Sequence, residues 1–77
     1  MTIILNTLER VKRFGNIAIK FDSDIDVIRN KYIVDGKSIL GIFTLDLRQP
    51  VDAEIHSNDE EEIRKFNEAM EEFKWER

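Results

Sequence analysis

The chain has 77 residues, of which 42% are hydrophobic and 36% charged, and its formal net charge is −4. This length predicts a single domain over residues 1–77 and excludes an enzyme whose cleft lies between two lobes. The sequence contains no cysteine, which excludes a disulfide scaffold, a thiolate metal site and thiol catalysis. No apolar run exceeds three residues, so we expect no transmembrane helix and no signal peptide.

The charge is distributed unevenly. Residues 59–77 hold eight acids against four bases, whereas residues 6–21 carry a local excess of +3. The acidic pI of about 4.9 argues against direct binding of nucleic acid, which requires a basic footprint. Arg10 and Arg13 instead form a candidate docking surface for an acidic protein partner, with an ordinary solvated helix face as the alternative.

Hydrophobic spacing predicts seven short elements. The predicted strands cover residues 2–5, 24–28, 32–34 and 51–56. A first helix is expected over residues 7–21, with Asn6 as its N-cap and Glu9 completing a capping box. A short helix carrying residues 39–45 follows a cap at Ser38, and a long last helix follows a cap at Ser57 or Asn58.

The order β-α-β-β-α-β-α predicts an α+β fold, with a four-stranded antiparallel sheet and three helices packed on one face. Gly15, inside the first helix, points to close packing at that position. The predicted core consists of Leu8, Val11, Ala18, Ile25, Val27, Ile63, Phe66 and Met70.

The sequence offers no catalytic or metal-binding constellation. His56 is the only imidazole, and no sequence partner accompanies it, so we interpret it as an ordinary residue at a strand end. Aspartates at 22, 24 and 26 resemble the start of a calcium loop, but Val27 and Ile33 occupy the positions that need glycine and glutamate. We therefore expect no enzyme activity, no metal and no cofactor.

The segment from Lys37 to Leu45 reads Lys-Ser-Ile-Leu-Gly-Ile-Phe-Thr-Leu. Its short helix holds more large apolar residues than one buried stripe can accommodate. We therefore expect Ile39, Leu40 and Phe43 to lie partly at the surface, and an exposed apolar patch indicates a partner. The alternative is that Ser38 only caps the helix while these side chains fill the core.

This segment resembles the histidine-containing phosphocarrier protein HPr of the bacterial sugar phosphotransferase system. Gram-positive HPr has Lys-Ser-Ile-Met-Gly-Val-Met-Ser-Leu at the corresponding place. Without a gap, residues 19–25 resemble the family's Ser-Lys-Tyr/Phe-Asp-Ala/Ser-Asp-Val/Ile, and residues 53–55 resemble its fourth strand. The resemblance covers roughly residues 2–73 and implies the family's open-faced β-sandwich.

The same register reveals a departure from the family. HPr carries its phosphoryl group on a histidine in a Gly-Ile/Leu-His-Ala-Arg-Pro segment, but Thr7 stands at the histidine position and Glu9 at the arginine position. Thr7 has no imidazole nitrogen, and Glu9 repels a phosphate. The sequence therefore predicts that this chain is inactive as a histidyl phosphocarrier, like the Crh branch of the family.

Ser38 matches the serine that HPr kinase/phosphorylase modifies in Gram-positive HPr, whose phosphorylated form acts as corepressor with a LacI-type regulator. The resemblance thus implies a cytoplasmic protein of carbon catabolite regulation, with Ser38 as the regulatory phosphorylation site. The expected partner-binding residues are Lys37, Ile39, Leu40, Phe43, Arg10 and Arg13. Two alternatives stay open: a phosphocarrier working through another residue such as His56, and an interaction module without any phosphorylation. A membrane partner is not expected.

Overall fold

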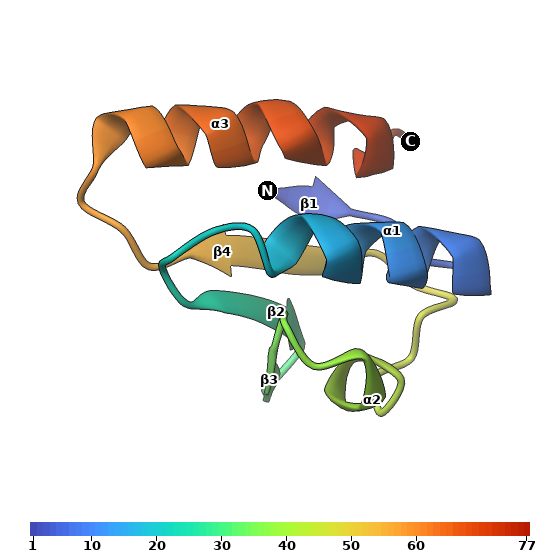
Figure 1. Cartoon of the computed structure of the whole chain (residues 1–77). Helices are drawn as coiled ribbons and strands as arrows, with labels where there is room; N and C mark the ends of the chain where they lie inside the picture. Colours follow the sequence, from blue (N-terminus) through green and yellow to red (C-terminus); the bar gives the residue numbers. More distant parts are fainter.

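The structure is a computed structural model that describes residues 1–77 (Figure 1). Its elements follow the predicted order, with one 3-10 turn added after the last helix. The elements are β1 (Thr2–Ile3), α1 (Leu8–Ala18), β2 (Ile25–Arg29), β3 (Tyr32–Asp35), α2 (Ile39–Ile42), β4 (Val51–Ile55), α3 (Glu60–Met70) and η1 (Glu71–Phe73). No helix has both the length and the apolar character needed to cross a membrane.

The four strands form one antiparallel sheet in the order β1-β4-β2-β3. Burial alternates along β4, where Val51 and Ala53 are buried and Asp52 and Glu54 are exposed. This period of two means that one sheet face packs against the helices and the other stays open. The backbone after η1 bridges to Ile3 of β1, which leaves β3 as the free edge. The predicted α+β architecture is confirmed.

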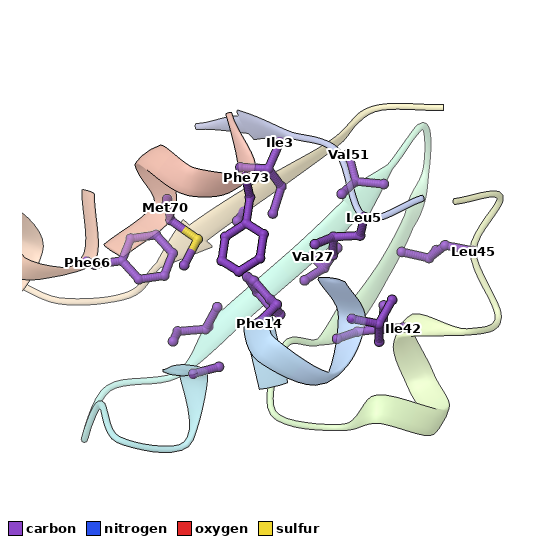
Figure 2. Packing of buried hydrophobic residues seen from close by; sticks show 14 residues of the cluster. Ile3, Leu5, Phe14, Val27, Ile42, Leu45, Val51, Phe66, Met70 and Phe73 are labelled. Carbon is purple, nitrogen blue, oxygen red and sulfur yellow. The ribbon is translucent and has the colours of Figure 1, made fainter. Parts of the chain in front are cut away.

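Fourteen buried hydrophobic residues form the core between the sheet and the helices (Figure 2). Phe14 of α1 meets Phe73 edge to face, with ring centroids 6.0 Å apart. The prediction for Leu8 is wrong, because this side chain is 57% exposed, and Ile63 is only half-buried. The stripe that α1 buries is centred on Val11, Phe14 and Ala18, and Leu8 falls at its edge.

The helices also begin and end at different residues from those predicted. Thr7 rather than Asn6 caps α1, because its Oγ1 accepts a hydrogen bond from the backbone N–H of Arg10 at 3.1 Å. Asp59 rather than Ser57 or Asn58 caps α3, since its carboxylate accepts from two backbone N–H groups of the first turn.

Both α1 and α2 are shorter than predicted. The helix α1 ends at Ala18 instead of residue 21. The backbone N–H groups of Lys20 and Phe21 donate to carbonyls three residues earlier in the chain, whereas an α-helix requires carbonyls four residues earlier. The helix α2 ends at Ile42, and Thr44 and Leu45 likewise continue it only as a tighter turn.

Candidate functional site

The tight connection between β3 and α2 positions Ser38. The N–H of Gly36 donates to the Ile25 carbonyl at 2.7 Å, and the N–H of Ser38 donates to the Asp35 carbonyl at 3.0 Å. Ser38 itself has an extended backbone, and its Oγ accepts a hydrogen bond from the N–H of Gly41 at 3.1 Å. The prediction that Ser38 caps the short helix is therefore confirmed.

Three large apolar side chains beside Ser38 are exposed. Leu40 is 82% exposed, Phe43 45% and Ile39 38%, whereas Ile42 is fully buried. A helix of four residues can turn only one side toward the core, and here Ile42 takes that side. The expected apolar patch is thus present; we call Ser38, Ile39, Leu40 and Phe43 the α2 surface.

A glycine allows α2 to lie close against α1. A Cβ at Gly15 would stand 3.1 Å from Cγ1 of Ile39, closer than ordinary van der Waals contact. The close packing expected at Gly15 is confirmed. Leu8 and Ile19 share the side of α1 that carries Gly15, and both are more than half exposed. The helical spacing of Leu8 from Val11 predicts burial, whereas in the structure Leu8 is exposed on this side of α1.

The predicted basic partner-binding residues are held by other parts of the chain. Nζ of Lys37 donates to the Phe21 carbonyl at 2.7 Å, and Nη1 of Arg10 donates to the Ile4 carbonyl at 3.2 Å. Arg13 forms an ion pair with Glu72 at 2.5 Å. These contacts fix the three side chains around the helices, and the pair with Glu72 offsets part of the excess charge of α1.

The start of α1 has the geometry of a capped helix and lacks a nucleophilic imidazole. Thr7 and Glu9 are both exposed, and the Thr7 hydroxyl is used in the cap. Glu9 lies in the first turn, where its carboxylate interacts favourably with the helix dipole and repels an incoming anion. The structure thus uses Thr7 to begin α1 and places a carboxylate in its first turn.

His56 lies just beyond the end of β4. Its Nε2 is 2.6 Å from Oδ2 of Asp26, and the hydrogen bond and charge of Asp26 raise the pKa of the imidazole. Glu54 and Asp24 raise the same pKa further. Three carboxylates at this end of the sheet therefore stabilise a protonated imidazole, whose Nε2 already contacts Asp26.

No cluster of three His, Cys, Asp or Glu side chains is arranged to hold a metal ion. The largest hollow, about 570 Å³, lies where the end of α1 meets the start of α3. Lys20, Lys65 and four acidic side chains line it, so charges of both signs are mixed there. None of the residues predicted to bind a partner lines this hollow.

Comparison with known proteins supplies a family. The model of the family described as the PTS HPr component phosphorylation site matches residues 10–74, a match that begins just beyond Thr7 and Glu9. No curated protein sequence matches the chain.

Two solved structures share the fold. HPr-C-His from Thermoanaerobacter tengcongensis is 28% identical, with a TM-score of 0.72 over 92% of this chain and 89% of that chain. The catabolite-repression protein Crh of Bacillus subtilis, solved as a dimer with a swapped domain, is 23% identical. Its TM-score is 0.66 over 99% of this chain and 90% of that chain, which supports the fold alone.

Proposed function

The chain belongs to the family of the HPr component of the phosphotransferase system, and on this basis we propose that it is a regulatory binding protein acting through Ser38 and the α2 surface. The observation that carries the proposal is a capping serine and exposed Leu40 and Phe43 in one short helix with its two caps. An exposed apolar group next to a modifiable hydroxyl gives a partner both a contact and a signal.

Phosphorylation of Ser38 adds a charge of about −1.5 to −2 next to these apolar side chains. The cap bond from Gly41 is already made, and a phosphate oxygen accepts such a bond as the hydroxyl does. The modification therefore changes the charge of the α2 surface while it leaves α2 in place. A partner with a basic group facing Ser38 gains affinity through this local charge.

The loss of the family histidine supports a regulator over a carrier. A carrier needs a nucleophile that accepts and releases a phosphoryl group, and neither Thr7 nor Glu9 provides an imidazole. By family resemblance, the expected partners are HPr kinase/phosphorylase and a LacI-type regulator, and the expected compartment is the cytoplasm. Leu8 and Ile19 extend the proposed contact area along α1.

The test treats the purified protein with HPr kinase and ATP and maps the phosphate by mass spectrometry. Ser38→Ala is the loss-of-site control, and Thr44→Ala removes the other hydroxyl of the same segment without touching the proposed site. We expect one phosphate on the wild type and on Thr44→Ala, and none on Ser38→Ala. Binding of the phosphorylated protein to a LacI-type regulator is then measured by calorimetry, with Leu40→Ser as the surface variant.

Phosphorylation that strengthens regulator binding, with weaker binding by Leu40→Ser, supports the proposal. If the protein stays unmodified beside a normally phosphorylated HPr, kinase regulation is wrong and Ser38 is only a cap. The interaction module without phosphorylation then becomes the better account.

A further inference from the structure

The guanidinium of Arg29, the last residue of β2, lacks a protein partner. Arg29 is half-buried, its Nε is shielded from solvent, and no hydrogen bond reaches this atom. Nor does Arg29 take part in any ion pair. Among buried side-chain nitrogen and oxygen atoms, the Nε of Arg29 is the single one without a partner. Buried polar groups are normally satisfied, so such an atom indicates a bound water or ion.

Arg29 lines a hollow of about 300 Å³ that lies between the β2–β3 turn and the segment after α2. Arg29 and Tyr32 are direct partners in the β2–β3 ladder, so both lie on the same face of the sheet. Across the hollow lie Thr44, Leu45 and Asp46, which follow α2. Asn30 lies at the turn itself, with a φ of 55° in the left-handed region.

Asp46, the acid in this lining, is already paired. Its Oδ1 accepts from Nε of Arg48 at 2.9 Å, and its Oδ2 accepts from Nη2 of Arg48 at 3.1 Å. These bonds hold the pKa of Asp46 below its usual value, so the carboxylate stays charged and bound to Arg48. Both oxygens of Asp46 are therefore engaged by Arg48, and Asp46 acts on Arg29 through its charge without a hydrogen bond.

The hydrogen-bonding groups of the lining match an anion with several oxygens. The Thr44 hydroxyl donates to the Gly41 carbonyl at 2.6 Å, which uses its proton. The donors that remain belong to three residues: the guanidinium of Arg29, the phenol of Tyr32 and the amide of Asn30. The planar fork of arginine pairs with two oxygens of a phosphate at once.

We propose that this hollow binds a phosphate group, carried by a small phosphate ester or present as free phosphate. Leu45 gives the hollow an apolar wall, and the exposed ring of Tyr32 stands at its rim. A volume of 300 Å³ reaches the lower end of the range of about 300–1,000 Å³ for small-molecule pockets. The lining follows the end of α2, and neither Ser38 nor any other residue of the α2 surface takes part in it.

The experiment titrates the ¹⁵N-labelled protein with inorganic phosphate and with phenyl phosphate at constant ionic strength. We expect saturable NMR shifts at the Arg29 side chain, at Asn30 and at residues 44–46. Arg29→Gln is expected to weaken binding about tenfold or more, since it removes a charge-assisted bidentate contact. Lys31→Gln is the matched control, because it removes an equal charge from an exposed neighbour outside the hollow. Asp46→Asn tests the same site in the opposite direction, and we expect it to tighten binding because it removes a negative charge from the lining.

The absence of saturable shifts at this hollow overturns the proposal. Equal weakening by Arg29→Gln and Lys31→Gln also overturns it, since the interaction is then nonspecific attraction to positive charge. Tighter binding of phenyl phosphate than of phosphate supports the site with an ester as its ligand. Equal affinities support it with free phosphate as the ligand.

Discussion

The helices α1 and α2 begin with the same kind of cap but differ in how many of their apolar side chains they bury. Thr7 and Ser38 are both extended N-caps, and each hydroxyl accepts a backbone hydrogen bond at 3.1 Å. Over its eleven residues α1 buries Val11, Phe14 and Ala18, whereas α2 has four residues and buries only Ile42.

This contrast separates a helix that supports the fold from one that displays a surface. The long helix gains its stability from packing its apolar stripe against the sheet. The short helix is held by one anchor and by its cap, and its other apolar side chains face outward. A hydroxyl at a helix start thus stabilises both helices, whether the helix buries its apolar stripe or leaves most of its apolar side chains exposed.

Removing the main anchor of α1 is expected to have the largest effect. Phe14→Ala should lower the free energy of unfolding by about 3–5 kcal/mol, because this fully buried ring packs against Phe73. A domain of this size has roughly 4–11 kcal/mol of stability, so the variant should unfold at low urea concentration. Urea denaturation measures the change, and Phe43→Ala, on the exposed side of α2, is the control. A loss below about 1 kcal/mol would mean that α1 is not the supporting helix.

The two sides of α2 can be compared directly with a matched pair of variants. Ile42→Ala should cost about 2–5 kcal/mol, because Ile42 is fully buried. Leu40→Ala should change stability by no more than about 0.5 kcal/mol, because its side chain lies mostly in solvent. Equal losses for the two variants would show that α2 presents no distinct outer side.

The two caps should be worth similar amounts. Thr7→Ala and Ser38→Ala are each expected to cost about 0.5–2 kcal/mol, since each removes the acceptor of one backbone N–H. Ser38→Asp should retain most of the stability, because a carboxylate also caps a helix. Thermal and urea unfolding of the three variants measure these differences. A Ser38→Asp protein that unfolds as readily as Ser38→Ala would argue against a cap that tolerates negative charge.

The smallest effect concerns His56, the single histidine of the chain, and its interaction with Asp26. Asp26 raises the pKa of His56 above the ordinary value of 6.5, so folding favours the protonated imidazole. This contribution is present in full below the unfolded pKa and is lost as the pH rises through the folded pKa. Histidine NMR titration should show a pKa that falls toward 6.5 in Asp26→Asn. An unchanged pKa in that variant would mean that the two side chains do not interact in solution.

The element order and the helix cap at Ser38 were predictable from sequence because both depend on local chemistry. Alternating and helical spacing reflect which side chains face the core, and a serine before an apolar run is a strong cap. The exposure of Leu40 also followed from sequence, since so short a helix cannot bury every apolar residue it carries.

Other features depend on contacts that the sequence does not reveal. Asn6 and Thr7 are both good caps, and only the path of the chain after β1 selects Thr7. The pair of Arg13 with Glu72 joins residues far apart in the chain. The hollow at Arg29 likewise arises where a turn meets the segment after α2, so no single stretch of sequence indicates it.

The most direct test of the central claim gives the same protein two phosphoryl donors. One sample receives phosphoenolpyruvate and Enzyme I, the other receives ATP and HPr kinase, and intact-mass spectrometry with site mapping compares them. We expect a stable adduct of about 80 Da, the mass of one added phosphoryl group, on Ser38 in the ATP reaction alone. An acid-labile adduct on His56 in the phosphoenolpyruvate reaction, with Ser38 unmodified by ATP, would contradict a regulator acting through Ser38.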